Sequence, residues 1–433
     1  MCLGLGEMRR MVLNTKQSGP QSIKKDQNSK QNQRHQEGLQ KSLHQIRIEN
    51  SAAFNADLER LIKRKSVQKA ENLLLKTLSD FQRGIDRKVR PDCFHFAIVI
   101  KGWGRSNCAD KAEKLMNKMI HLHKNGNPPC PWLKPNKVVY SSVVNCWAMS
   151  KSKGSALRAE KLLKQMTLST GVQPNYVTYS TVIKAWAKEG CAERAEELLR
   201  EMDNLFSNGN RRVKPNTVTY NLVIEAFAKS NENGSADKAE KLLKRMTILY
   251  EKGDSSVKPD IKSYSNVIDA YAASDEVGSP QKAESILRLI ELLFLRGDKE
   301  LKPSVITYGT VIKAWTRHNN PQRAEGILKR MEMAMVQPNS VCFYMVIAAW
   351  ARTSEQGSVE KVESLLNRMH AIQESENQRE IVINPGAKIY TAVIDTYVNS
   401  QDPTAPHRAE DLLRFMVKGY DEGNIALKPT IGK

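Results

Sequence analysis

The chain has 433 residues, of which 40% are hydrophobic and 26% are charged, and its formal net charge at pH 7 is +20. This length exceeds what one hydrophobic core supports, so we expect several domains or an elongated array. No run of about 18 apolar residues occurs, so we expect no membrane span. Scattered cysteines without a C-x-x-C pair argue against a disulfide framework. The positive charge favours a polyanionic partner such as a nucleic acid, although a surface that only keeps the protein soluble is an alternative.

The N-terminal part of the chain is irregular. Residues 1–45 are rich in Gln, Ser, Lys and Asn and poor in hydrophobic residues, which predicts a disordered or targeting segment. Residues 46–92 contain Lys69-Ala70-Glu71, a signature that returns in every later unit but one. However, Thr77 stands where most later units have Met, and no aromatic stripe precedes the signature. We interpret 46–92 as a degenerate N-terminal helical repeat.

A repeat that begins at a proline organises the rest of the chain. The prolines recur at intervals of 35 to 47 residues, at positions 91, 135, 174, 215, 259, 303, 338, 385 and 429. An apolar stripe with spacing i, i+3, i+4, i+7, which marks one face of an α-helix, follows each of the first eight. The stripes are Phe96-Val99-Ile100-Trp103, Tyr140-Val143-Val144-Trp147, Tyr179-Val182-Ile183-Trp186, Tyr220-Val223-Ile224-Phe227, Tyr264-Val267-Ile268-Tyr271, Tyr308-Val311-Ile312-Trp315, Phe343-Val346-Ile347-Trp350 and Tyr390-Val393-Ile394-Tyr397.

A second helix follows each stripe with the same spacing. It reads Ala195, Leu198, Leu199, Met202 in one unit and opens with Lys/Arg-Ala-Glu in nearly all of them. The small Ala suits a close helix crossing, and the Leu-Leu-Met face fills the space between neighbouring pairs. We expect the Tyr and Trp stripes to be core, and the Glu after each Ala to be a surface position.

These patterns predict the fold. The Asn or Asp after each proline is suited to cap the first helix of its unit. One helix pair cannot bury its apolar face alone, so neighbouring pairs must stack. The sequence therefore predicts an all-α protein, a right-handed α-solenoid of stacked helix–turn–helix repeats, with eight repeats over 93–430.

The openings Pro174-Asn175-Tyr176-Val177-Thr178-Tyr179 and Pro215-Asn216-Thr217-Val218-Thr219-Tyr220, together with Ala-Glu-x-Leu-Leu-x-x-Met, resemble the pentatricopeptide repeat. The resemblance covers about residues 52–430. It departs in length, since the family's usual unit has 35 residues and only the interval 303–338 has that length here. The extra residues, such as 203–213 and 247–257, fall after the second helix. We expect them to lengthen that helix or its outer loop.

The resemblance implies that each unit reads one RNA base. The readers would be the fifth residue after the Pro-Asn/Asp pair and the unit's last residue, which gives the pairs Ala97/Asn136, Ser141/Asn175, Ser180/Asn216, Asn221/Asp260, Ser265/Ser304, Gly309/Asn339, Tyr344/Gly386 and Thr391/Thr430. In the family a hydroxyl with Asn favours adenine, and Asn with Asp favours uracil. This implies an A-A-U core read by residues 137 to 260, and the last two pairs predict nothing firm.

Two further sets of residues follow from the resemblance. The second residue of each unit would sandwich the base, which suits Val138, Val177, Val218, Ile306 and Val341 but not Lys262 or Lys388. Cations at the thirteenth place could contact phosphates, namely Arg105, Lys188, Lys229, Arg317 and Arg352. The simpler interpretations are that the Asn and Asp residues only cap helices and that the cations are only solvated.

The function that the resemblance implies is sequence-selective binding of single-stranded RNA, in organellar RNA stability, processing or translation, in a mitochondrion or a plastid. We expect a monomer with no catalytic site, cofactor or metal, which works alone or with other RNA-processing proteins. His121, His123 and Cys130 lack a fourth metal ligand. A protein-binding helical-repeat scaffold and a targeting subunit of a larger enzyme or ribosome stay open as alternatives.

Overall fold

The computed structural model describes residues 49–428 except 127–128, 231, 354, 356, 377–384 and 401. The expected disordered or targeting segment 1–45 and the reader Thr430 lie outside the described residues. Within the described part, the regular secondary structure is α-helix and short 3-10 turns, without strands. The predicted all-α fold is confirmed. None of the described helices combines the length and the apolar run that crossing a bilayer would need.

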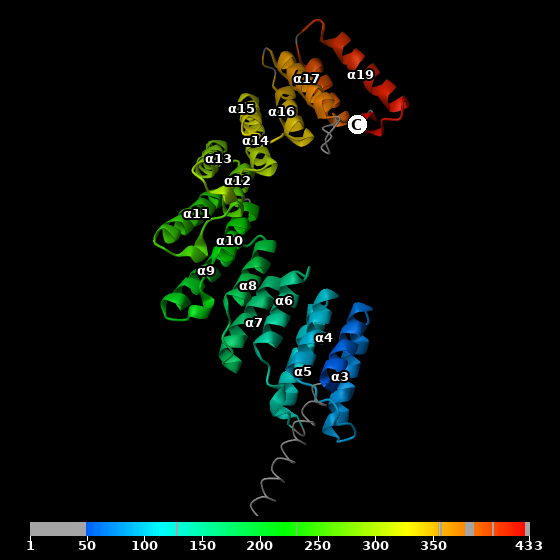
Figure 1. Ribbon diagram of the computed structural model, residues 1–433, viewed down its shortest axis with the longest axis vertical. Helices are drawn as coiled ribbons and strands as arrows, with labels where there is room; N and C mark the ends of the chain where they lie inside the picture. The colour runs from blue at the N-terminus through cyan, green and yellow to red at the C-terminus, as the bar shows by residue number, and fades with distance from the viewer. Residues whose placement is uncertain are drawn as a thin grey trace, which may run out of the picture. The chain divides into compact units, whose positions relative to one another are not determined.

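The chain forms two compact units, Met1–Gln173 and Pro174–Lys433. In the first unit, helical residues 49–63 are followed by α3 (Val67–Gln82), α4 (Cys93–Arg105), α5 (Ala109–Asn125), α6 (Lys137–Met149) and α7 (Ser155–Thr170). Helix α4 packs against α3, α5 and α6, and α7 packs against α6 (Figure 1). Phe54 of the first helical segment lies against the ring of His95 in α4. The boundaries 1–45, 46–92 and 93–430 stay a prediction.

The second unit continues the helix pairs. Its helices are α8 (Tyr176–Lys188), α9 (Ala192–Ser207), α10 (Thr217–Ser230), α11 (Ser235–Glu251), α12 (Ile261–Ala273), α13 (Ser279–Leu295), α14 (Val305–Arg317), α15 (Pro321–Met333), α16 (Ser340–Ala351), α17 (Ser358–Glu376), α18 (Ala387–Asn399) and α19 (Ala405–Asp421). The even-numbered first helices pack on one another in succession. Each second helix from α9 to α17 packs on its own first helix and on the next one. This stacking confirms the solenoid of helix–turn–helix repeats.

The polar residue after each proline caps the first helix of its unit. Its side chain accepts the backbone N–H three residues further on, as seen for Asp92, Asn136, Asn175, Asn216, Asp260, Ser304 and Asn339. Gly386 stands at the start of α18 and offers no side-chain cap. The predicted capping role is confirmed for the seven residues that have a suitable side chain.

The aromatic stripes form the core, as predicted. Tyr140, Tyr220, Tyr308 and Phe343 are fully buried, while Trp186 is partly exposed. On α9 the set Ala195, Leu198, Leu199 and Met202 is also fully buried. On α19 only Met416 of the equivalent set is buried, because no described repeat covers that face.

The extra residues of the long repeats both lengthen the second helix and form a tight turn. Helix α9 extends to Ser207 and is followed by the 3-10 turn Arg211–Val213. Helix α11 extends to Glu251 and is followed by the 3-10 turn Ser255–Val257. Val213 and Val257 are buried, so each turn returns the chain to the core before the next proline. Both alternatives expected from the sequence therefore occur together.

In four repeats the Glu after the second-helix Ala is not the surface position that the sequence suggested, although it is partly exposed in others and exposed at Glu410. Glu113, Glu160, Glu284 and Glu325 are buried. In five repeats this Glu accepts a hydrogen bond from the last aromatic residue of the next stripe, in the pairs Trp103–Glu71, Trp147–Glu113, Tyr271–Glu240, Trp315–Glu284 and Tyr397–Glu363. The expectation was wrong because a buried Trp N–H or Tyr O–H needs an acceptor, and the packed second helix supplies one.

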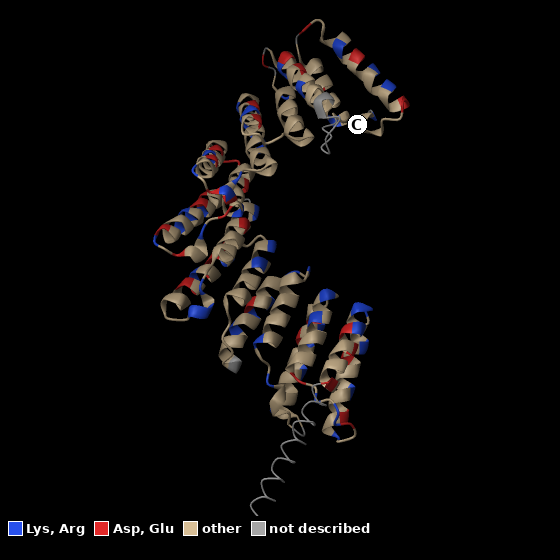
Figure 2. Ribbon diagram, viewed as in Figure 1, with Lys and Arg blue, Asp and Glu red and all other residues tan. Residues whose placement is uncertain are grey.

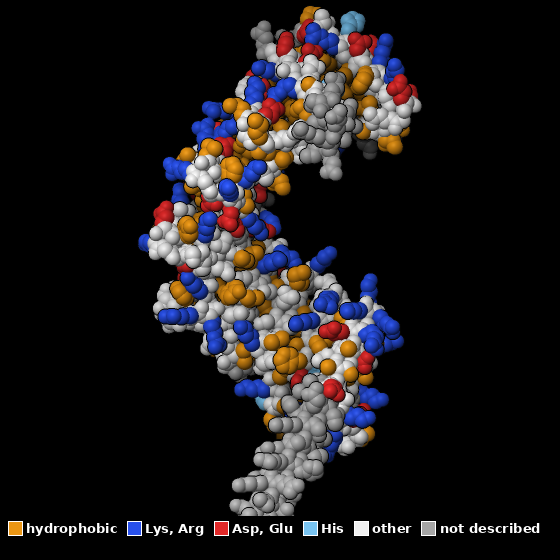
Figure 3. All heavy atoms as spheres, in the orientation of Figure 1, with side chains coloured by type: hydrophobic (Ala, Val, Ile, Leu, Met, Phe, Trp, Pro, Cys, Tyr) orange, Lys and Arg blue, Asp and Glu red, His pale blue; other side chains and the backbone are white. Residues whose placement is uncertain are grey.

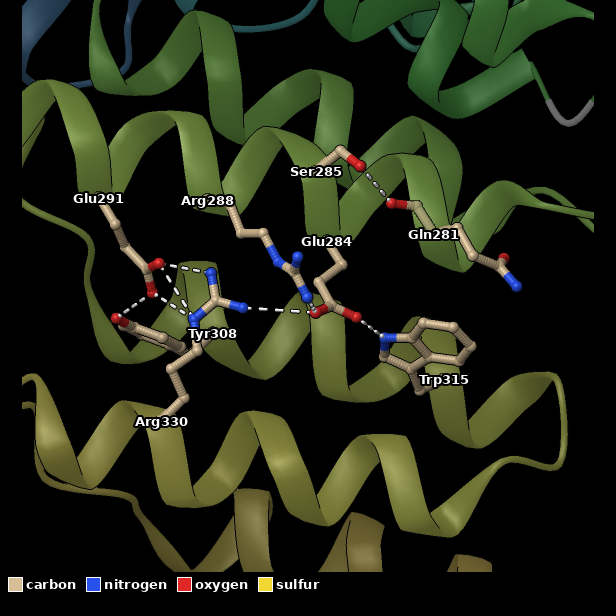
Figure 4. A network of polar contacts seen from close by, with 8 residues as sticks. All are labelled: Gln281, Glu284, Ser285, Arg288, Glu291, Tyr308, Trp315 and Arg330. Carbon is tan, nitrogen blue, oxygen red and sulfur yellow. Dashed lines mark hydrogen bonds and ion pairs between the residues drawn. The ribbon is translucent and has the colours of Figure 1, made fainter.

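Figure 4 shows a network of polar contacts that includes one of these hydrogen bonds, between Trp315 and Glu284. Trp315 donates to Glu284 at 3.1 Å, and Arg330 of the following repeat binds both Glu284 and Glu291. Tyr308 donates to Glu291 at 2.7 Å. Burial and this carboxylate together raise the pKa of Tyr308, so its hydroxyl stays a donor. Side chains from two successive repeats are thereby joined, since the two glutamates lie on α13 and their partners lie on α14 and α15 of the next repeat.

Candidate nucleic-acid interface

The second residues of the units lie on the surface of the first helices. All five predicted sandwiching residues are exposed, up to 76% for Ile306, and the set is Val138, Val177, Val218, Ile306 and Val341. Phe94 occupies the same place at the start of α4 and is 61% exposed. The sequence interpretation missed Phe94, although its spacing from Pro91 would have identified it. Branched aliphatic and aromatic residues are usually buried, so their repeated exposure in one register makes these positions a candidate contact surface.

The fifth residues lie one helical turn further along the same helices. Ser141, Ser180, Ser265 and Gly309 are partly exposed, whereas Asn221 is only 4% exposed. Among the capping partners, Asp260, Ser304 and Asn339 are exposed and Asn175 and Asn216 are half-buried. The two readers of a pair thus come from successive first helices, one from within a helix and one from the cap of the next helix.

Asn221 and Asp260 are in direct contact. The Asn221 amide donates to Asp260 Oδ1 at 3.0 Å, and the hydroxyl of Ser263 donates to Asn221 Oδ1 at 2.6 Å. Asp260 Oδ1 also accepts from the backbone N–H and the hydroxyl of Ser263. Asp260 Oδ2 accepts no hydrogen bond from any described residue. The pair is therefore held rigidly with one carboxylate oxygen available.

Ser180 and Asn216 are joined through a third residue. The hydroxyls of Ser180 and Thr219 lie 3.2 Å apart, and Thr219 donates to Asn216 Oδ1 at 3.0 Å. Asn216 Oδ1 also caps α10, so its amide nitrogen is left free to donate. This arrangement offers a hydroxyl and an amide N–H next to each other.

The remaining predicted pairs differ from these two. Ser141 lies on α6 in the first unit and Asn175 caps α8 in the second. No hydrogen bond joins Ser265 to Ser304 among the described residues. Gly309 has no side chain, and a Cβ there would lie 3.6 Å from Cys342 Sγ, in ordinary contact. These units have fewer fixed polar groups than the central two.

The predicted phosphate cations are all exposed, but all of them except Arg105 interact with other residues of the protein. Lys229 pairs with Glu225 at 2.6 Å, and Arg317 binds both carboxylate oxygens of Asp275. Arg352 donates to the backbone oxygen of Thr316 at 3.1 Å. Arg105 has no hydrogen bond or ion pair with any described residue. Figure 2 shows the wider pattern, in which Lys and Arg alternate with Asp and Glu along the helices.

Charge and apolar surface are interleaved. In Figure 3, exposed hydrophobic side chains lie among Lys and Arg on the face shown. Burial opposes ionisation of Glu225, but Lys229 and Lys262 outweigh it and lower the pKa of the carboxyl. Within the described part of the chain, no group of three or more His, Cys, Asp or Glu residues is placed to hold a metal ion.

Three family models match the chain at these repeats. The model described as PPR repeat family matches residues 174–229, the pentatricopeptide repeat domain matches 296–352, and the PPR repeat matches 94–122 and 218–248. This chain is a pentatricopeptide repeat protein. The matched segments cover helix pairs in both units, including α8 to α11 and α14 to α16.

Solved structures with similar folds are pentatricopeptide repeat and RNA-bound proteins. The maize protein PPR10 is 18% identical, with 88% of this chain and 59% of PPR10 covered and a TM-score of 0.40. PPR10 in complex with an 18-nt psaJ RNA element gives 17% identity, coverages of 95% and 58%, and a TM-score of 0.41. Yeast Rmd9p in complex with a 16-nt target RNA gives 12% identity, coverages of 90% and 81%, and a TM-score of 0.34. This pentatricopeptide repeat protein spans less than two thirds of the length of PPR10. No curated protein sequence matches it.

Proposed function

We propose that this chain binds single-stranded RNA sequence-selectively and acts in organellar RNA stability, processing or translation. The observation that carries the proposal is the row of exposed apolar residues at one register of successive first helices, represented by Val177, Val218, Ile306 and Val341. A nucleobase has two apolar faces, and proteins that bind single strands contact these faces with apolar or aromatic side chains.

The spacing of the helices favours a single strand. Packed helices lie about 8–10 Å apart, whereas stacked bases in a duplex are about 3.4 Å apart. A side chain from each first helix would therefore separate neighbouring bases and leave their edges open. Such edges are the groups by which sequence is recognised in RNA.

The selectivity that we propose comes from the central pairs. The free oxygen of Asp260 only accepts, so it favours the N–H edge of uracil, as the family's Asn-with-Asp pair implies. Ser180 offers a hydroxyl oxygen that accepts and Asn216 offers an amide N–H that donates, and this combination suits adenine. With Ser141 and Asn175 assigned in the same way, the proposed core is A-A-U. Ser265/Ser304 and Gly309/Asn339 would add weaker selectivity.

A selection from random RNA tests this function. The purified chain is incubated with single-stranded pools at two salt concentrations, and the retained RNA is sequenced. We expect enrichment of A-A-U in the wild type. The double variant Asn221→Ser, Asp260→Asn creates an adenine-type pair and should change A-A-U to A-A-A. Lys262→Ala, at an exposed place two residues after Asp260, is the control. Tight binding without sequence preference would overturn the base-reading assignment, and no binding at low salt would overturn RNA binding itself.

A protein-binding scaffold is the second candidate. The observation that favours it is the exposed apolar face of α13, with Leu289, Leu292 and Leu295. This face belongs to a second helix and does not carry the reader residues. If RNA binding failed at low salt, this face would be the surface to test for a protein partner.

We assign no catalytic activity to the chain itself. The carboxylates that recur with the repeats, such as Glu113 and Glu284, are bonded to the aromatic N–H of the next repeat and to Arg side chains. They are used for packing. A monomer in a mitochondrion or plastid, alone or with other RNA-processing proteins, fits this proposal.

A further inference from the structure

A pocket of about 510 Å³ lies between the first helices α16 and α18, at a unit whose reader pair predicts no particular base. Tyr344 and Ala348 of α16 line it on one side, and Lys388, Ala392 and Asp395 of α18 line it on the other. Its volume lies within the range of roughly 300–1,000 Å³ that is typical of small-ligand sites. The two alanines leave the room that larger side chains would fill.

The seventh unit differs from its neighbours at both reader positions. Tyr344 stands where other units have Ala, Ser, Asn, Gly or Thr, and Gly386 stands where they have a polar cap. The Tyr344 side chain is exposed, with 37% of the residue accessible. Two hydrogen-bonding readers are therefore missing, and a flat aromatic surface at the pocket takes their place. Stacking on an aromatic ring binds bases of every kind with useful affinity.

A free carboxylate supplies the selectivity that stacking lacks. Asp395 is exposed and has no hydrogen bond or ion pair with any described residue. Asp269 stands at the same place in the fifth unit, where burial raises the pKa of its carboxyl. A carboxylate accepts two parallel N–H bonds. Guanine presents two neighbouring donors on its Watson–Crick edge, the ring N1–H and the exocyclic amine, and no other RNA base does.

Two cationic side chains line the pocket and are available to bind the phosphate of a nucleotide. Lys388 lines it from α18, and it has no ion pair among the described residues. Arg352 lines it from the end of α16 and uses one guanidinium nitrogen on the Thr316 carbonyl, which leaves the other N–H groups to donate. The pocket therefore brings an aromatic face, a free acceptor and two positive charges together.

We propose that this pocket binds a guanine nucleotide of the bound RNA. The base lies on Tyr344, its N1–H and amine donate to Asp395, and Lys388 and Arg352 hold the phosphate. The inference rests on the proposed RNA binding. With one base per unit, this guanine is the third nucleotide beyond the U of A-A-U, on the side away from the adenines.

Binding of four RNAs tests the assignment. Each carries A-A-U, two fixed nucleotides and then G, A, C or U, and affinity is measured by fluorescence anisotropy. We expect the G form to bind about tenfold tighter, which is within the range for a bidentate contact. Asp395→Asn should remove this preference and leave binding of the A form unchanged. Tyr344→Leu should weaken all four. Asp269→Asn, at the matched place in the fifth unit, should keep the preference for G.

A second arm separates this inference from RNA binding itself. Guanosine and adenosine monophosphates are added to the chain, and binding is followed by ligand-observed NMR with the same variants. Equal affinity for the four RNAs, with A-A-U selectivity intact, would overturn the guanine pocket alone. If guanosine monophosphate binds the wild type but not Asp395→Asn, and none of the RNAs binds, the pocket is a site for a free nucleotide and its RNA role is overturned. If neither the RNAs nor guanosine monophosphate bind, both the guanine pocket and RNA binding are overturned.

Discussion

The indole N–H of Trp147 donates a hydrogen bond of 2.8 Å to Glu113, although the two residues belong to successive repeats. Arg158 of the later repeat also binds this carboxylate through two nitrogens. Glu113 lies on α5, the second helix of the preceding repeat. It therefore connects the end of α6 with the start of α7. The contact is one of the links by which one repeat stabilises the next.

Glu113→Ala should destabilise the first unit. It leaves the Trp147 N–H without its acceptor in a buried place, which costs about 1–3 kcal/mol. The measurement is the protection of backbone amides in α5 to α7 by hydrogen exchange, since repeat arrays need not unfold in one step. Glu59→Ala, at an exposed place in the same unit, is the control. Equal protection in both variants would show that the contact contributes nothing.

Val218→Asp should weaken RNA binding without affecting the fold. Val218 is exposed, so its replacement removes no core contact, but it places a negative charge where we propose a base. The expected loss of affinity is roughly fivefold or more. Anisotropy with an A-A-U RNA measures it, and circular dichroism monitors the helix content. Leu295→Asp changes an equally exposed apolar residue on α13 and should bind RNA like the wild type.

Arg105 and Arg317 should differ in their contribution to binding, although both stand at the thirteenth place. Arg105 is free to release a counterion, so Arg105→Ala should make the slope of log affinity against log salt shallower by about 0.7. Arg317 is held by Asp275 at 2.7 and 3.0 Å, so Arg317→Ala should change the slope much less. Titrations at four salt concentrations compare the two. A larger change for Arg317 would argue against this ranking.

Gly386→Asn should stabilise α18. The backbone of Gly386 is extended, and a Cβ there would approach Ala426 O at 3.7 Å, which is ordinary contact. Asn adds the cap that the other first helices have and restricts the unfolded chain, so the gain is about 0.5–1 kcal/mol. The denaturation midpoint of the second unit reports it. Gly326→Asn, in the middle of α15, adds no cap and should raise the midpoint by less, since the helix propensity of Asn is only slightly better than that of Gly.

Cys146 should resist alkylation in the folded protein. Burial raises the pKa of its thiol to about 12, so almost no thiolate forms at pH 8. The exposed Cys191 should react under the same conditions. Mass spectrometry after iodoacetamide treatment compares the two. Because the folded pKa is raised, the associated stability is fully present below about pH 9 and is lost progressively as the pH rises towards 12.

The repeat pattern predicted most of the fold. Spacing of Tyr, Val, Ile and Trp identified each first helix, and the Asn or Asp after the proline identified its start. These features are local, because the apolar face and the cap lie within two turns of each other. The same register also predicted Val177 and Val218 as candidate contacts, and it would have added Phe94. The register could not predict which polar side chains already have hydrogen-bond or ion-pair partners within the protein.

The sequence alone therefore determined the helices, their caps and the core face, since each depends on residues within one helix. The tertiary structure decided which side chains meet across repeats: Trp147 with Glu113, Asn221 with Ser263 and Asp260, and Tyr344 with Asp395 at one pocket. These partners lie tens of residues apart in the chain. Their meeting depends on the crossing and register of stacked helices, which the packing of all their side chains sets together.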